Sequence, residues 1–318
     1  MRRKFSIGWV TVVKNSPEDH SPHSHYTLYL GCTVPVRALN YEISARKVAE
    51  KLGVQFSDNP DFSCCGYPIK SVNRYAYLLL AARNLALAEQ KGLPLCTLCS
   101  ACCGSLTEAN HEIQKDEELR RRINDDLSEC LGMRYEGGIR VTHFTRILQE
   151  EIRKKRVAEQ IQADLSELRV AAHYGCHYIK PSTIYGKTEN PEDPKSLDEL
   201  IQATGAQSIY YEDKLQCCGG GVLAIDEQVA LAMSQKKLEH IRAQQADAMV
   251  LICPFCSVMY EGNQRKIEKA SQKEFKLPVL FYPQLLGLAL GISPDELGLK
   301  MNRVRPTEML KKIHQRLG

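Results

Sequence analysis

The arrangement of its cysteines constrains this chain more than any other feature of the sequence. Thirteen cysteines occur among 318 residues. In the second half a single cysteine is followed by an adjacent pair and then by a C-x-x-C motif: Cys176, Cys217-Cys218, and Cys253 with Cys256. The first half has the same order: Cys32, Cys64-Cys65, and Cys99 with Cys102. Corresponding cysteines lie 144 to 154 residues apart, which indicates a duplicated domain rather than scattered buried thiols or a solenoid array.

A disulfide framework explains this pattern poorly. An odd number of cysteines leaves one thiol over, and disulfide scaffolds are normally small secreted domains that cannot build a core. The basic segment from Met1 to Phe5 is not followed by an apolar stretch or a small-residue cleavage site, so no secretory signal is expected. We therefore expect a cytoplasmic protein with free thiols.

Membrane and nucleic-acid functions are also disfavoured. The most apolar segment, residues 277–292, is interrupted by Pro278 and Pro283, so no transmembrane segment is expected. The formal net charge is only +4, which is too small to indicate nucleic-acid binding by itself. Hydrophobic residues make up 43% of the chain, as in a globular protein with a core.

Five cysteines per half suggest iron–sulfur chemistry more than zinc. A structural zinc ion takes four ligands in a closed tetrahedron. Adjacent residues on an extended segment point their side chains apart, so Cys64 and Cys65 are expected to reach different irons of a larger cluster, or one of them to bridge two irons. No regular ferredoxin spacing occurs, which points to an unusual cluster geometry rather than a cubane. Zinc in one half remains the minor alternative.

The register of the first C-x-x-C motif needs a choice, because Cys96 and Cys99 also fit it. The residues that follow Cys102 match those that follow Cys256, and the spacing after the adjacent pair agrees in both halves. Cys99 and Cys102 are therefore the candidate ligands. The ordinary or auxiliary thiols are then Cys96, Cys103 and Cys130.

The expected secondary structure is α/β, with the cysteines at strand ends. Apolar strands at 26–30, 169–174 and 248–252 run towards Cys32, Cys176 and Cys253. Helical patterns cover 38–52, 73–90, 142–156 and 226–246, the last with Asp226 as its N-cap. Ligands bind at the carboxyl ends of strands in such sheets. The expected organisation is an N-terminal extension (1–25), two domains (26–160 and 161–305) and a basic tail (306–318), for which a solvated face is the default and a partner-docking helix the alternative.

Residues 219–224 formally fit the G-x-G-x-x-A dinucleotide fingerprint. They follow a cysteine pair instead of a strand. Close approach of the backbone to a cluster explains these glycines better. We expect no flavin on this chain.

The chain resembles the B-subunit family of heterodisulfide reductase, whose members are built from two cysteine-rich CCG domains. The resemblance spans Tyr26 to Arg305 and includes an ordered set of motifs: Gly31-Cys32, Cys64-Cys65-Gly66, Cys99-Ser-Ala-Cys102, Thr142-His-Phe144, residues 174–182, Cys217-Cys-Gly219, Cys253-Pro-Phe-Cys256 and residues 284–291. The segment Gly66 to Val72 departs from the family pattern, because methanogen members tend to have a Pro-Ala-Pro-Gly-like loop there, and the Trp-containing extension from Met1 to His25 is also unusual. The departure leaves open a relative from sulfur metabolism with a different sulfur substrate.

The resemblance implies two pseudo-symmetric CCG domains, each a small sheet with flanking helices and one non-cubane 4Fe–4S cluster. The ten implied ligands are Cys32, Cys64, Cys65, Cys99, Cys102, Cys176, Cys217, Cys218, Cys253 and Cys256. It further implies that a disulfide substrate is cleaved or formed between the two clusters, each sulfur being captured at a cluster iron. The implied partners are the ferredoxin-like C subunit and the flavin-containing A subunit of the same type of complex.

Two residues after Cys176 are candidates for contacting the substrate. His177 and Lys180 could meet an anionic or thiolate group, and the alternative is a pair at a helix start that points to solvent. Two other functions stay open: CCG domains also occur as pure electron-transfer subunits, and zinc could stabilise a non-enzymatic scaffold.

Overall fold

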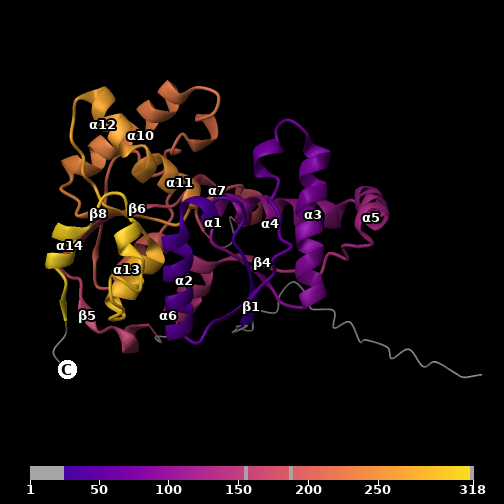
Figure 1. The fold of residues 1–318 in the computed structure, drawn as a ribbon, viewed down its shortest axis with the longest axis horizontal. Helices are drawn as coiled ribbons and strands as arrows, with labels where there is room; N and C mark the ends of the chain where they lie inside the picture. Colours follow the sequence, from indigo (N-terminus) through magenta and orange to yellow (C-terminus); the bar gives the residue numbers. More distant parts are fainter. Residues whose placement is uncertain (1–24, 154–156, 186–188, 316–318) are drawn as a thin grey trace, which may run out of the picture.

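The computed structural model describes residues 25–153, 157–185 and 189–315, and it contains two four-stranded parallel sheets flanked by helices (Figure 1). The expected N-terminal extension, apart from His25, lies outside the described residues. The first sheet has the strand order β2 (Gln55–Asp58), β1 (His25–Tyr29), β3 (Leu95–Thr97) and β4 (Val141–His143). The second has the order β7 (Gln207–Ile209), β6 (Arg169–His173), β8 (Ala248–Leu251) and β9 (Val279–Phe281).

Helices connect the strands, because parallel neighbours need a crossover that returns the chain to the same end of the sheet. The helices of the first half are α1 (Val34–Arg37), α2 (Leu39–Lys51), α3 (Arg74–Lys91), α4 (Ser100–Lys115), α5 (Glu117–Leu131) and α6 (Phe144–Arg153). Those of the second half are α7 (Cys176–Ile179), α8 (Ser182–Tyr185), α9 (Ser196–Ala203), α10 (Glu227–Ala243), α11 (Pro254–Ser257), α12 (Gln264–Ser271), α13 (Tyr282–Ala289) and α14 (Thr307–Lys311). The predicted α/β fold with two pseudo-symmetric halves is confirmed.

Most of the predicted elements occur close to their expected bounds. The strands β1, β6 and β8 and the helices α2, α3 and α10 are confirmed, and Asp226 caps α10 by accepting a hydrogen bond from the Val229 amide. One prediction was wrong in part. Thr142 and His143 were placed in a helix, but they end the buried strand β4, and α6 begins at Phe144. Pairing with β3 fixes this segment as a strand, an effect that local periodicity does not report.

Matching backbone conformations show how closely the two halves correspond. The glycine after each cysteine pair has a positive φ, +83° at Gly66 and +82° at Gly219, and each precedes a short 3-10 turn, at Tyr67–Ile69 and Gly220–Val222. Each turn leads into a long helix with an equivalent cap, Asn73 for α3 and Asp226 for α10. The duplication inferred from the sequence is therefore present in the structure.

The two halves pack tightly against each other. Helix α2 of the first half lies beside α13 of the second (Figure 1). In this contact the rings of Tyr41 and Phe281 stack at 4.1 Å between centroids, and Asn40 donates a hydrogen bond to Asn302. The buried core is continuous from one half to the other.

The predicted basic tail is folded in the part of it that is described. Met309 of α14 is buried, and a short strand, β10 (His314–Gln315), pairs antiparallel with β5 (Ala163–Asp164). Within the described residues, no helix has both the length and the apolar character needed to cross a membrane.

Candidate functional site

The candidate cysteines lie beyond the carboxyl ends of the parallel strands in both sheets. Cys32 follows β1, and Cys99 follows the neighbouring strand β3. Cys176 and Cys253 follow β6 and β8, which are also neighbours. Since the ends of parallel strands meet at one edge of a sheet, each half gathers its cysteines there.

Nine of the ten candidate thiols form one continuous row in which each thiol interacts with the next. In order along the row they are Cys64, Cys65, Cys102, Cys99, Cys253, Cys256, Cys218, Cys217 and Cys176. The Cys218 and Cys256 sulfurs are 3.6 Å apart. The two halves join in the middle of the row, where the Sγ atoms of Cys99 and Cys253 are 4.0 Å apart.

The tenth candidate thiol lies beside the row. Cys32 is exposed, its Sγ lies 3.8 Å from the Thr33 hydroxyl, and its charge raises the pKa of Cys64, although less than the Cys65 contact and burial do. The two thiols of each adjacent pair interact with each other and shift each other's pKa, Cys64 with Cys65 and Cys217 with Cys218. A tight turn at the following glycine bends each of these segments.

Backbone amides point at these sulfurs in the same way in both halves. The amides of Gly219 and Gly220 donate to the Sγ atoms of Cys217 and Cys218, each at 3.4 Å. The backbone at Gly66 and at Tyr67 donates to the Cys64 and Cys65 sulfurs. Such donors favour the thiolate, which is the form that binds metals.

Three thiols of the row have a lowered pKa, and each of them lies between thiols whose pKa is raised. Hydrogen bonds from Cys176 and Cys218 lower the pKa of Cys217 to about 2, and hydrogen bonding to Cys217 raises the pKa of Cys218 to about 12. Donors also lower the pKa of Cys65, mainly Cys102, and the pKa of Cys253, mainly Cys256. The row therefore presents several thiolates to a cation in a largely buried site.

The middle of the row is fixed by contacts between the halves. The Ile252 carbonyl, just before Cys253, accepts hydrogen bonds from Tyr41 Oη (3.3 Å), Ser100 Oγ (3.4 Å) and His143 Nε2 (3.1 Å). All three donors belong to the first half. The imidazole Nδ1 of His143 in turn lies 2.7 Å from the Thr145 hydroxyl. This network holds Cys253 in a set position relative to Cys99.

The two predicted substrate contacts lie in different surroundings. His177 is partly buried, and its Nε2 is 3.1 Å from the Tyr67 hydroxyl of the first half. A Cβ added at Gly104 would lie 3.2 Å from His177, so only glycine lets α4 approach it this closely. Lys180 is exposed at the C-terminal end of α7. The structure thus brings His177 to the junction of the halves and leaves Lys180 at the surface.

Sequence reasoning missed Tyr67, which reaches the cysteines of the opposite half. The pKa of Tyr67 is raised to about 12, mainly by burial and next by the charges of Cys176 and Cys217. Its hydroxyl therefore keeps its proton. The segment Gly66 to Val72 departs from the family pattern, and that departure was the only signal at this position.

The remaining cysteines have ordinary surroundings. Cys96 is fully buried in β3, and burial raises its pKa well above the usual value. Cys103 is buried in α4, with the Tyr185 hydroxyl 4.0 Å away, and Cys130 is exposed on α5. None of the three belongs to the row.

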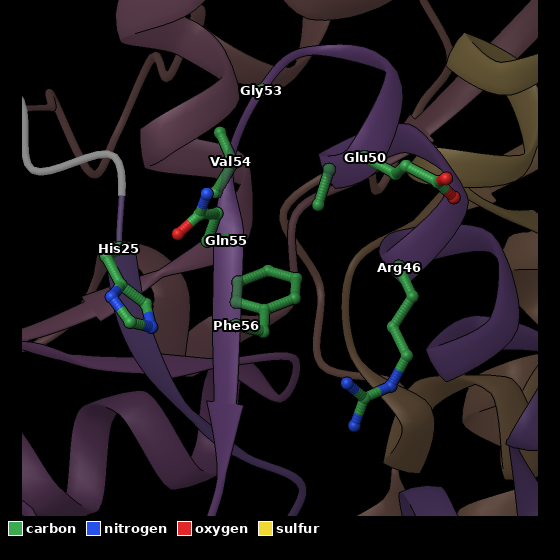
Figure 2. A pocket seen from close by; sticks show the side chains of 8 residues that line it. His25, Arg46, Glu50, Gly53, Val54, Gln55 and Phe56 are labelled. Carbon is green, nitrogen blue, oxygen red and sulfur yellow. The ribbon is translucent and has the colours of Figure 1, made fainter.

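A cavity of about 500 Å³ lies away from the cysteines, between α2 and β2. Figure 2 shows its lining, which includes His25, Arg46, Glu50 and Phe56. None of the described residues that line it is a cysteine. The cavity is therefore separate from the thiol row.

The donor set fits a polynuclear cluster in each half. Within the described residues, no three His, Cys, Asp or Glu side chains are grouped so that one metal ion could bind between them. Iron–sulfur clusters distribute their thiolate ligands over several irons, and in the second half His173 offers a buried Nε2 without a protein partner, which a cluster sulfide could accept from.

Comparison with known proteins identifies the family. The family model of the cysteine-rich domain CCG matches residues 26–107 and 170–261. The chain is 40% identical over 293 residues to the B subunit of the ferredoxin/F(420)H(2)-dependent CoB-CoM heterodisulfide reductase of Methanosarcina acetivorans, covering 91% of this chain and 97% of that protein. It is 33% identical over 285 residues to the 8-methylmenaquinol:fumarate reductase membrane anchor subunit of Wolinella succinogenes, covering 89% of this chain and 98% of that protein.

A solved structure shares the fold. The crystal structure of a hypothetical protein from Helicobacter pylori superimposes with a TM-score of 0.71 at 19% identity, covering 92% of this chain and 54% of that chain. The ordered cysteine motifs, the paired parallel sheets and the relatives agree. The chain belongs to the B-subunit family of heterodisulfide reductase, the iron–sulfur oxidoreductase subunits built from two CCG domains.

Proposed function

We propose that this chain is the disulfide-reducing subunit of a heterodisulfide-reductase-type complex, with one non-cubane 4Fe–4S cluster per half. The first cluster would be held by Cys32, Cys64, Cys65, Cys99 and Cys102, and the second by Cys176, Cys217, Cys218, Cys253 and Cys256. The observation that carries the proposal is the 4.0 Å contact between Cys99 and Cys253, because it joins the two ligand sets at one place.

Two adjacent one-electron centres suit the chemistry of a disulfide. Cleaving one S–S bond takes two electrons and two protons and gives two thiols, and forming the bond reverses this. When bound, the two clusters supply one electron each. The residues between the halves hold the substrate and a proton.

Tyr67 and His177 are the side chains best placed for that task. They come from opposite halves, and their Oη and Nε2 atoms share one hydrogen bond of 3.1 Å. The pair therefore keeps a proton at the junction, where a product thiolate would need one. Lys180, exposed nearby in the sequence, would at most attract an anionic substrate.

The relatives support a role within a larger assembly. The Methanosarcina relative is by name one subunit of a ferredoxin-dependent reductase, which supports electron delivery by a ferredoxin-like C subunit and a flavin-containing A subunit. Free thiols and iron–sulfur clusters persist in a reducing compartment, so we place the complex in the cytoplasm.

A second function is favoured by one comparison. The Wolinella relative is by name part of a fumarate reductase, and a chain of that type would pass electrons on without binding a disulfide. Thiol or disulfide binding at the clusters separates the two functions.

Metal analysis and spectroscopy of the anaerobically purified protein test the proposal. We expect about eight irons and eight acid-labile sulfides per chain, and a new paramagnetic signal when a candidate thiol is added to the oxidised protein. Half of that iron with one zinc would contradict the two-cluster site. A full iron content without any thiol-induced signal would favour the electron-transfer function. The variant Cys130→Ser is the matched control, since Cys130 is exposed and outside the row.

A further inference from the structure

The two half-sites differ at two buried positions that face the cysteine pair. In the second half these are His173, at the end of β6, and Lys237, in the middle of α10. The corresponding residues of the first half are Tyr29, at the end of β1, and Asn84, in α3. All four side chains are buried. A basic pair in one half thus replaces a neutral pair in the other.

The contacts of Lys237 are those of an ammonium group. Its Nζ lies 2.6 Å from the Gln216 carbonyl, 3.0 Å from the Lys214 carbonyl and 3.3 Å from Nδ1 of His173. An ammonium group has three donors and no acceptor, so three acceptors satisfy it fully. Burial lowers its pKa to about 8, which still leaves the group mostly protonated at neutral pH.

His173 extends this positive character towards the sulfurs. Its Nδ1 accepts from Lys237, so the proton of the neutral ring is on Nε2. That Nε2 is buried and has no hydrogen-bond partner. The charges of Cys253 and Cys217 act on the ring, and a small cavity lies between His173, Cys176 and Gln216. The unpaired N–H is therefore a buried donor that an acceptor bound beside it would satisfy.

The first half uses neutral groups to hold the same loop. Tyr29 donates its hydroxyl to the Ser63 carbonyl at 2.6 Å, and Asn84 accepts from the Ser63 amide and donates to the Cys64 carbonyl. Ser63 corresponds to Gln216 in the second half. A difference in surface charge does not accompany this change, because the preceding helical position carries a cation in both halves, Arg83 and Lys236.

We propose that Lys237 and His173 make the cluster of the second half the easier one to reduce. The inference rests on the two-cluster function proposed above. Adding an electron makes a cluster more negative, and a buried cation and an N–H donor stabilise that state. The first half has no equivalent for either group at these positions. An external one-electron donor of the ferredoxin class would thus fill the second-half cluster first and the first-half cluster second.

Potentiometric titration of the full protein, followed by electron paramagnetic resonance, tests the proposal. The variant Cys64→Ser lacks a proposed ligand of the first-half cluster, so the signal that remains in it is assigned to the second half. We expect Lys237→Met to change the equilibrium constant for reduction of that cluster at least tenfold, which lowers its midpoint by at least 59 mV for one electron. The first-half midpoint should stay in place. Lys236→Met removes a surface charge one residue away, where Lys236 pairs with Asp213 at 2.9 Å, and should shift neither midpoint.

Two further variants keep the test decisive if Lys237→Met does not fold. The double variant His173→Tyr with Lys237→Asn gives the second half the residues of the first, and the two midpoints should converge. Asn84→Lys leaves the second half intact and should raise the midpoint of the first-half cluster. Unchanged midpoints in variants that contain both clusters would overturn the inference. A shift in Lys236→Met as large as that in Lys237→Met would overturn it as well.

Iron content, measured before each titration, separates this failure from that of the proposed function. About four irons in the unmodified protein would refute the two-cluster site itself. About eight irons with midpoints that do not respond to Lys237 would refute only the asymmetry.

Discussion

The first half of the molecule surrounds its cysteine pair with Tyr29 and Asn84, and the second half with His173 and Lys237, on backbones that are nearly the same. The φ angles of Gly66 and Gly219 differ by one degree, and both halves point backbone amides at the paired sulfurs. The comparison teaches that the backbone was kept to hold the thiols, whereas the buried side chains around them were free to diverge.

Replacing one cysteine of each pair should have the largest effect. We expect Cys64→Ser and Cys217→Ser each to lower disulfide turnover by more than about 100-fold, since a ligand matters more than the groups around it. Each variant should keep the iron of the other half. Iron content and turnover are measured together, with Cys130→Ser as the control, and normal turnover in either variant would show that one half is not needed.

The glycine after each pair tests whether the two backbones are equally constrained. We expect Gly66→Ala and Gly219→Ala each to lower the free energy of unfolding by about 2–3 kcal/mol. A Cβ would lie 2.9 Å from the Tyr77 carbonyl oxygen in one half and 2.8 Å from the Ala230 carbonyl oxygen in the other.

Gly53→Ala is the control for φ alone, because Gly53 has a φ of +73° and no atom within 4 Å of the added Cβ. It should cost about 1 kcal/mol. Chemical denaturation of the three variants gives the comparison. A cost at Gly66 and Gly219 no larger than that at Gly53 would argue against the close backbone approach.

Lowering the pH should reduce the free energy of unfolding through a buried histidine of the first half. Burial lowers the pKa of His143 from 6.5 to about 3, so below pH 6.5 the unfolded chain takes up a proton that the folded chain refuses. The free energy of unfolding should then fall by up to about 1.4 kcal/mol per pH unit from this site. The corresponding strand of the second half ends at Phe281, which cannot titrate.

Denaturation curves between pH 7 and pH 4 measure this effect. The variant His143→Gln cannot take up the proton, and its stability should depend less on pH, although it should be lower at pH 7 by about 1–2 kcal/mol for the altered hydrogen bonds. An identical pH slope in both proteins would assign the acid sensitivity to other groups.

Replacing the two residues that the sequence suggests as substrate contacts should have the smallest effects. We expect His177→Ala to slow turnover about tenfold, because it removes the contact with Tyr67 across the junction. Lys180→Ala should change KM by less than about threefold, as an exposed charge acts only at long range. Steady-state kinetics at two salt concentrations separates the two. A larger effect at Lys180 than at His177 would contradict the placement of the substrate at the junction.

Much of the fold could be predicted because its signals are local. The strands that lead to Cys32, Cys176 and Cys253 are continuous apolar segments, and Asp226 is a helix cap that sequence alone reveals. The strands β2, β4, β7 and β9 are only three or four residues long. Pairing with a neighbour stabilises them more than their own composition does, and for that reason Thr142 and His143 were assigned to a helix.

The candidate site could be predicted only as two separate sets of ligands. The order of the cysteines predicts each set of candidate ligands, but nothing in the sequence places Cys99 next to Cys253. The contacts of Tyr67 with His177 and of Lys237 with His173 join residues far apart in the chain. Such contacts depend on tertiary packing, and a helical lysine at position 237 is, in sequence, one of many surface candidates.

Because the two halves are joined in one chain, each half can acquire substitutions that the other does not share. In a symmetric dimer of identical chains, every substitution appears on both sides of the interface. A Tyr-to-His change at the strand end would then alter the surroundings of both cysteine sets together. Because the halves of this molecule belong to one chain, the gene can change one copy and leave the other alone, and a division of labour between two facing centres becomes heritable.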